Sequence, residues 1–72
     1  MSKIMKEAKK LIESYDGQGW ETQGFEYDYD NNASILEMMH KNGNKMKLNI
    51  NFHSQTISVY INNRLKDQTK IK

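Results

Sequence analysis

Two histidines, His40 and His53, are the side chains of this chain best suited to acid–base chemistry or metal binding near neutral pH. A shared metal site would require both imidazoles to contact the same ion. The strand pattern described below places His40 opposite Met46, and His53 lies seven residues farther along that strand. At about 3.3 Å per residue, the two histidines are then roughly 23 Å apart. We therefore expect no metal site between them.

Glu26 and Asp28 are the second candidate for chemistry. Carboxylates two residues apart on a strand point to the same face, about 7 Å from each other, and this is near the separation of the two carboxyl groups in glycosidases. However, a chain of 72 residues with one helix has little room for a substrate cleft, and no calcium-type loop motif accompanies the pair. We interpret these carboxylates as part of a solvated strand face.

The other motifs do not predict an enzyme either. The segment Gly17-Gln18-Gly19 lacks the Lys-Ser/Thr ending of a phosphate-binding loop and follows a helix rather than a strand. We interpret it as a helix stop, with Gly17 as the left-handed residue. The chain has no Cys, which excludes disulfides and thiolate sites. We predict a non-enzymatic protein without a cofactor or catalytic residues.

The charges of the chain are sorted along its length. Residues 16–37 hold six carboxylates and no Lys or Arg, whereas residues 38–72 hold seven cations and one carboxylate. The formal net charge of +2 hides this dipole, and a dipolar surface steers and orients partners. The candidate acidic surface comprises Glu21, Glu26, Asp28 and Asp30. The alternative explanation is internal, because neighbouring strands can neutralise each other by cross-strand pairs.

Periodicity predicts the elements that position these residues. Apolar residues at helical spacing, with Ser2 as the N-cap, predict a helix over residues 2–15. Alternation of apolar and polar residues predicts strands at about residues 20–29, 34–41, 45–53 and 56–62, with a short fifth strand at 64–70. Gly24 is expected to form a bulge that resets the register of the first strand, and Asn62-Asn63 a two-residue hairpin turn.

Residues 33–41 contain good helix formers, so a second helix is the alternative there. The turn signature Asn42-Gly43-Asn44 before a strong strand favours a strand. A three-residue loop at 42–44 would direct Leu36 and Met38 into the core, whereas a two-residue loop would bury a carboxylate. We prefer the three-residue loop.

The fold class that follows is α+β. Residues 1–72 form a single small domain in which one N-terminal helix packs on an antiparallel meander of four or five strands, in two layers. We expect the aromatic residues in phase with apolar strand positions to lie in the core, with base-stacking platforms as the alternative. These aromatic residues are Phe25, Tyr27, Tyr29 and Phe52.

A single helix covers only one face of a sheet, so the other face is expected to be open. Amphipathic and amide side chains of the kind that contact surfaces favour alternate there with lysines. The candidate partner-binding residues on this face and the basic edge are Ile35, Met39, Lys45, Lys47, Asn49, Asn51, Tyr60, Arg64 and Lys66. A solvated face with scattered apolar residues is the alternative.

We predict a small protein-binding module that acts on a larger protein through this face or an edge strand, as an inhibitor or adaptor of a bacterial phage or mobile element. Self-pairing of the opposite charges makes a homodimer an alternative. A second hypothesis is a nucleic-acid-binding protein that uses the C-terminal lysines and Tyr60, which the six carboxylates and the single Arg disfavour. The chain lacks an apolar run typical of a membrane span or a signal peptide, so we expect no membrane contact and a cytoplasmic location.

Overall fold

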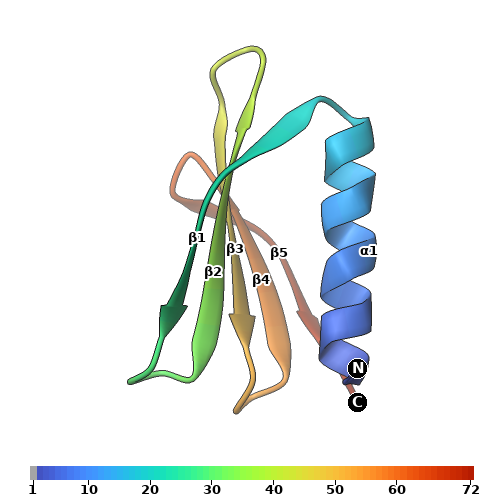
Figure 1. The fold of residues 1–72 in the computed structure, drawn as a ribbon, viewed down its shortest axis with the longest axis vertical. Coiled ribbons are helices and arrows are strands. Elements are labelled where there is room, and N and C mark those ends of the chain that lie inside the picture. The colour runs from blue at the N-terminus through green and yellow to red at the C-terminus, as the bar shows by residue number, and fades with distance from the viewer. Residues whose placement is uncertain (1) are drawn as a thin grey trace.

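The computed structural model describes residues 2–72, which form one helix and one five-stranded antiparallel sheet. The elements are α1 (Lys3–Gly17), β1 (Trp20–Asp28), β2 (Ala33–His40), β3 (Lys45–Asn51), β4 (Thr56–Ile61) and β5 (Arg64–Lys70). The strands are neighbours in sequence order, and the helix lies on one side of the sheet (Figure 1). The predicted α+β meander is confirmed, the fifth strand is present, and residues 33–40 form a strand rather than a helix.

Helix α1 begins where its sequence predicts and ends two residues later than expected. The Oγ of Ser2 accepts a hydrogen bond from the backbone N–H of Met5 at 3.4 Å, which caps the first turn. Gly17 is the last helical residue, so its prediction as the left-handed stop is wrong. Gly19 takes that role with a φ of +97° and turns the chain into β1.

The core lies between α1 and the helix-facing side of the sheet, in two buried clusters. The first comprises Trp20, Leu36, Met38, Met46, Leu48 and Val59, and the second comprises Ile4, Ala8, Ile50 and Ile57. Leu11 packs against both clusters and joins them. Full burial of one such aliphatic side chain contributes about 1.5–3 kcal/mol. These clusters must stabilise a chain of 72 residues without a disulfide.

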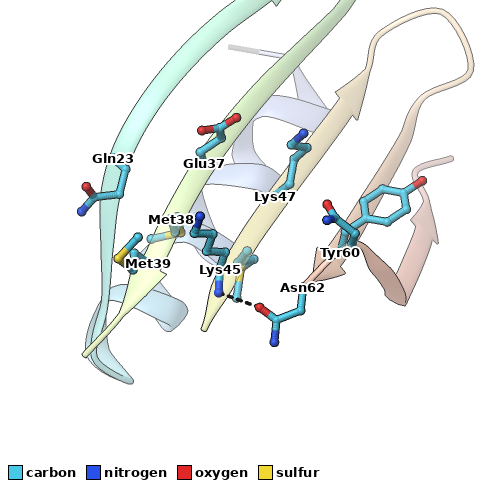
Figure 2. Close-up of a pocket in the computed structure, with 10 residues that line it drawn as sticks. Gln23, Glu37, Met38, Met39, Lys45, Lys47, Tyr60 and Asn62 are labelled. Atoms are coloured by element: carbon cyan, nitrogen blue, oxygen red, sulfur yellow. Dashed lines mark hydrogen bonds between the residues drawn. The ribbon is translucent and has the colours of Figure 1, made fainter. Parts of the chain in front are cut away.

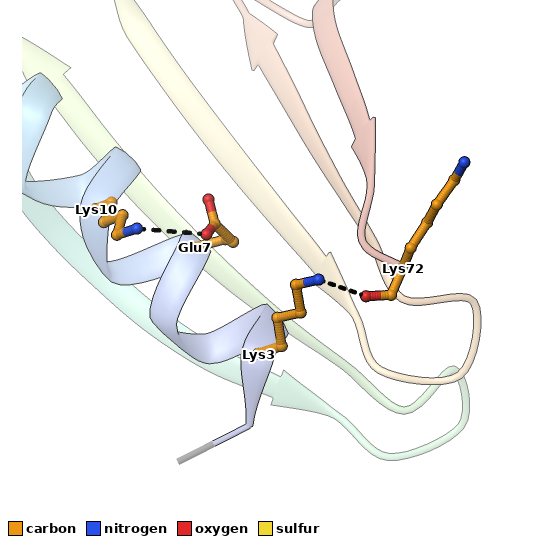
Figure 3. A network of polar contacts seen from close by, with 4 residues as sticks. All are labelled: Lys3, Glu7, Lys10 and Lys72. Carbon is orange, nitrogen blue, oxygen red and sulfur yellow. Dashed lines mark hydrogen bonds and ion pairs between the residues drawn. The ribbon is translucent and has the colours of Figure 1, made fainter.

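The two ends of the described chain meet beside the second cluster. The Nζ of Lys3 donates a hydrogen bond to the backbone carbonyl of Lys72 at 2.8 Å (Figure 3). Ile71 packs against the cluster of Ile4 and Ala8, and its N–H donates to the carbonyl of Gln55 at 2.7 Å. The C-terminal segment is thereby placed against the first turn of α1.

The β2–β3 loop has an odd number of residues, as predicted, but the pairing of the two strands is shifted by two residues. Leu36 lies opposite Leu48 rather than Ile50. The loop has three residues, 41–43, because the N–H of His40 donates to the carbonyl of Asn44 at 2.9 Å and closes it one residue earlier than expected. His40 therefore does not pair with Met46, as was predicted.

The loop closes early because Gly43, with a φ of +94°, supplies the left-handed residue that three-residue hairpin loops require. Since the loop length stays odd, the same side chains face the core as predicted. Leu36 and Met38 are buried, and Glu37 is exposed on the opposite face.

Three of the four aromatic side chains predicted to lie in the core are outside it, namely Phe25, Tyr27 and Tyr29. Phe25 is opposite the buried Leu36 and thus on the helix-facing side, yet it is 67% exposed, and Tyr29 is 86% exposed. The predicted bulge is present between Thr22 and Gly24. Beyond it, β1 runs away from the helix (Figure 1), and Phe25, Tyr27 and Tyr29 are exposed.

Candidate functional site

No element of residues 2–72 covers the face of the sheet opposite α1 (Figure 1), and we call it the open face. Alternation along β2, β3 and β4 directs every second side chain to it. The register aligns these residues in cross-strand rows, with Lys47 between Glu37 and Tyr60, and Asn49 between Ile35 and Ser58. The open face is therefore a mixed surface of apolar, amide and charged groups.

Seven of the nine candidate partner-binding residues share this face. They are Ile35, Met39, Lys45, Lys47, Asn49, Asn51 and Tyr60. Arg64 is opposite Ile61 and so belongs to the helix-facing side, and Lys66 is the extra residue at the register shift in β5. The structure therefore groups the residues of β2, β3 and β4 but leaves the two β5 cations outside the group.

The open face contains a hollow with a volume of about 460 Å³ that extends from β1 to β4. Figure 2 shows ten of the residues that line it. Met39 and Tyr60 supply apolar and aromatic surface, and Glu37, Lys45 and Lys47 supply charges of both signs. Such a hollow is able to receive an amphipathic side chain of a partner.

The charged groups of the hollow are not neutralised by direct contacts. Glu37 is paired with Lys47 in the β2–β3 register. Across residues 2–72, however, the only salt bridge is the one between Lys10 and Glu7 on α1, at 3.5 Å (Figure 3). The Glu37 carboxylate and the Lys47 ammonium therefore remain able to contact a partner.

Asn62 holds the rim of the hollow in place. Its Oδ1 accepts a hydrogen bond from the backbone N–H of Lys45 at 3.0 Å (Figure 2). Its Nδ2 donates to Oδ1 of Asn44 at 3.1 Å. Asn62 and Asn63 have φ angles of 51° and 67°, which confirms the predicted two-residue turn. The β4–β5 turn is thus tied to the β2–β3 loop.

His40 has a structural role at the junction of α1 and β1. Its Nδ1 accepts a hydrogen bond from the N–H of Asn42 at 3.2 Å, so the ring hydrogen belongs on Nε2, which lies 2.9 Å from the Gln18 carbonyl oxygen. The ring of His40 packs edge-on against Trp20, with centroids 5.1 Å apart.

His53 is exposed in the β3–β4 loop. Nowhere in residues 2–72 do three or more acidic, His or Cys side chains form a group able to hold a metal ion.

The four candidate acidic residues lie along β1 and the turn that follows it. Asp28 caps this turn, because its Oδ1 accepts hydrogen bonds from the N–H groups of Asp30 at 3.1 Å and Asn31 at 3.3 Å. Its Oδ2 accepts from Nδ2 of Asn31 at 2.7 Å. These bonds, led by the one from the Asn31 side chain, lower the pKa of Asp28 below its ordinary value of 3.8.

One exposed aromatic group was not predicted from the sequence, and we call it the β1 aromatic patch (Phe25, Tyr27 and Tyr29). Phe25 and Tyr27 are on the helix-facing side of β1, and Tyr29 lies just beyond the end of the strand. The rings of Tyr27 and Tyr29 are perpendicular, with centroids 4.6 Å apart. The Tyr27 hydroxyl donates to Oδ1 of Asn32. The sequence contained one indication of this exposure. The first strand of a meander lies at the edge of the sheet, where a single helix does not cover it completely.

Comparison with known proteins gives no match to a family model, to a curated protein or to a solved structure. No helix of the described chain is long and apolar enough to cross a bilayer. Function is therefore inferred from the surfaces themselves.

Proposed function

We propose that this chain is a non-enzymatic protein-binding module whose open face docks on a larger protein, as an inhibitor or adaptor. The observation that carries this proposal is an uncovered sheet face with a hollow and with half-buried Ile35, Met39 and Tyr60 among amides and lysines. Tyr and Met are enriched in protein interfaces, and Asn supplies adaptable hydrogen bonding.

The size of the open face suits this role. A standard interface buries about 800 Å² on each partner, which is roughly a sixth of the 5096 Å² that the chain exposes. Five strands of about seven residues cover roughly 24 by 23 Å. In projection this is about 550 Å², roughly two thirds of a standard footprint, so the open face supplies most of a docking surface and an adjoining edge strand supplies the rest.

Nucleic-acid binding is less well supported than protein binding. Lys47 and Tyr60 are adjacent across β3 and β4, which is a favourable arrangement for a phosphate and a base. The same face carries Glu37 beside Lys47 and Glu26 beside Ile35, and these carboxylates repel phosphates. Arg64 lies on the other side of the sheet.

Site-specific photo-crosslinking in cells of the source organism tests the proposal. A benzophenone amino acid replaces Tyr60 on the open face or, as the matched control, Lys9, which is exposed on α1. We expect a discrete protein adduct from position 60 that is absent from position 9. Equal adducts from both positions, or none from position 60, would contradict docking through the open face.

A separate titration addresses the nucleic-acid alternative. Fluorescence anisotropy of labelled single- and double-stranded oligonucleotides is measured at low and near-physiological salt. We expect no binding at low salt, where phosphate contacts are strongest. Micromolar or tighter binding that weakens steeply with salt would favour the nucleic-acid function instead.

A further inference from the structure

A second surface, separate from the open face, lies along the free edge of β1. β1 is the first strand of the sheet, so no strand of the described chain pairs with the backbone groups of its outer edge. The ladder with β2 is regular from Gly24 to Asp28, beyond the bulge. This five-residue segment is a template for an added strand.

We propose that residues 24–28 of β1 bind an extended, cationic segment of a partner protein, which adds to the sheet as a sixth strand. The partner segment alternates, with Lys or Arg directed to the open-face side of β1 and apolar or Arg side chains directed to the β1 aromatic patch. Backbone hydrogen bonds supply affinity in this mode, and the alternating side chains supply specificity.

The two edges of the sheet differ in the protection that they carry. Edge strands are commonly blunted by charges, which prevent unwanted strand pairing. β5 carries charges on both faces, with Arg64 and Asp67 on the helix-facing side and Lys70 on the open side, and Leu65 is its single exposed large apolar residue. The helix-facing side of β1 instead presents Phe25 and Tyr27, so it favours a partner.

The β1 aromatic patch continues the core out to this edge. Phe52 packs against the second core cluster, its ring centroid is 6.4 Å from that of Tyr27, and Tyr27 contacts Tyr29. Phe25 is 67% exposed and Tyr27 39% exposed. These rings offer apolar surface, and their exposed faces attract Lys or Arg by cation–π interaction.

Charge complementarity identifies the partner as cationic. Glu26 and Asp28 alternate with the aromatic residues and belong to the opposite side of β1, and residues 16–37 contain no Lys or Arg. No carboxylate of β1 takes part in a salt bridge with another described residue. The negative electrostatic potential around β1 repels nucleic acids and acidic lipid surfaces and attracts a basic protein segment.

The test is an NMR titration of the full, ¹⁵N-labelled chain with a ten-residue peptide that alternates lysine and valine. The matched control peptide alternates glutamate and valine. With the lysine peptide, we expect saturable amide shifts and slowed hydrogen exchange at residues 24–28, and weaker binding as salt increases. With the glutamate peptide, we expect no response.

Two variants localise the effect. Phe25→Ser with Glu26→Lys removes one ring and reverses one charge at the β1 edge, and should weaken lysine-peptide binding about tenfold or more. Leu65→Ser with Asp67→Lys makes the matched change on β5 and should leave binding unchanged. All four positions are exposed, and unchanged reference spectra outside the substituted strands show that each variant is folded.

Three outcomes would overturn the proposal. They are shifts centred on β5 or the open face, equal binding of both peptides, and no shift at millimolar lysine peptide. Shifts at β1 that grow with protein concentration, without any peptide, would assign the edge to a second copy of the chain instead. None of these results depends on Tyr60, so the open-face proposal stands or fails separately.

Discussion

At the scale of single residues, Gly19 is the one glycine of the four at which an added Cβ atom would contact a neighbouring side chain. Its φ of +97° is a conformation that side chains rarely adopt, and a Cβ atom there would lie 3.0 Å from Nε2 of His40. The same imidazole holds the Gln18 carbonyl, so it cannot move away without losing a hydrogen bond. We expect Gly19→Ala to destabilise the fold by about 1–3 kcal/mol in urea denaturation.

Gly17 provides the matched control for this substitution. It is helical, and a Cβ atom there would meet nothing within 4 Å. Gly17→Ala should therefore stabilise the fold by about 0.4–1 kcal/mol. If both substitutions change stability in the same direction and by the same amount, the junction of α1 and β1 is not strained in the way described.

Asp28 gives the β1–β2 turn a defined pH dependence. The folded state lowers its pKa, so the ionised form contributes stability above the ordinary value of 3.8 and loses it as the pH falls through the folded pKa. We expect Asp28→Ala to lower the melting temperature at pH 6, and the difference from wild type to vanish in strong acid. Thermal melts by circular dichroism between pH 2 and pH 6 measure this difference.

Asn31→Ala supplies an independent check on the cause. It keeps the carboxylate of Asp28 but removes its strongest hydrogen bond, the one from Nδ2 of Asn31. The resulting loss of melting temperature should fade over the same acidic range. A loss that stays constant down to pH 2 would mean that Asn31 acts through the backbone of the turn alone.

At the scale of the elements, periodicity predicted which way side chains point but not what covers them. Alternation correctly placed Leu36 and Met38 on the core side, and it also placed Phe25 on that side. Phe25 is nevertheless exposed, because cover depends on where α1 crosses the sheet, which is a tertiary feature. The face that a strand residue occupies, in contrast, follows from the alternation of side chains alone. The grouping of Lys47 and Tyr60 on one face was therefore predictable from the sequence.

The register was harder to predict than the faces. A loop of three residues fits either position 41–43 or position 42–44, and both keep the same side chains inside. The choice depends on the backbone conformation of Gly43, which has a φ of +94°. The local sequence favours this conformation at Gly43 but is also compatible with the loop at 42–44. The shift of two residues in the strand pairing could therefore not be predicted from the sequence.

The turn between β4 and β5 allows two neighbouring residues of like conformation to be compared. Asn62 and Asn63 both have positive φ, but only Asn62 has side-chain hydrogen bonds, to Lys45 and Asn44. Asn62→Gly should destabilise the fold by about 0.5–1.5 kcal/mol for each net bond lost. Asn63→Gly should be neutral or slightly stabilising, because Gly is favoured in such turns. Chemical denaturation of both variants distinguishes side-chain from backbone contributions, and equal losses would show that the hydrogen bonds of Asn62 are unimportant.

At the scale of the whole molecule, the sheet keeps its opposite charges apart. β1 carries three carboxylates, and its neighbour β2 adds only Glu37 and no cation. β5 carries three cations and one carboxylate, and its neighbour β4 has no charged residue. The single opposite pair in direct register between neighbouring strands is Glu37 with Lys47. Internal cross-strand neutralisation therefore does not explain the sorting of charges along the chain.

This arrangement predicts how stability responds to salt. Attraction between neighbouring strands would make the fold less stable as salt screens it, whereas like-charge repulsion within β1 and within β5 would make it more stable. The sheet register contains one direct pair of opposite charges, Glu37 with Lys47. We therefore expect like-charge repulsion within the edge strands to outweigh attraction between neighbouring strands. We expect the melting temperature to rise by a few degrees between about 0.01 M and 0.3 M sodium chloride, since about 1 kcal/mol shifts it by about 4–8 °C in a domain of this size.

Charge reversal at one edge tests the source of that response. Glu26→Lys places a cation near Asp28 on the same side of β1, so it should raise the melting temperature at low salt and reduce the salt response. Lys66→Glu at the bulge of β5 is the counterpart at the opposite edge, between Arg64 and Lys70 in sequence, and should act in the same direction. A melting temperature that falls with salt in the wild type would restore internal attraction as the reason for the charge pattern. A rise with salt would mean that the folded state maintains two repulsive edges at a cost in stability, as expected for surfaces that bind oppositely charged partners.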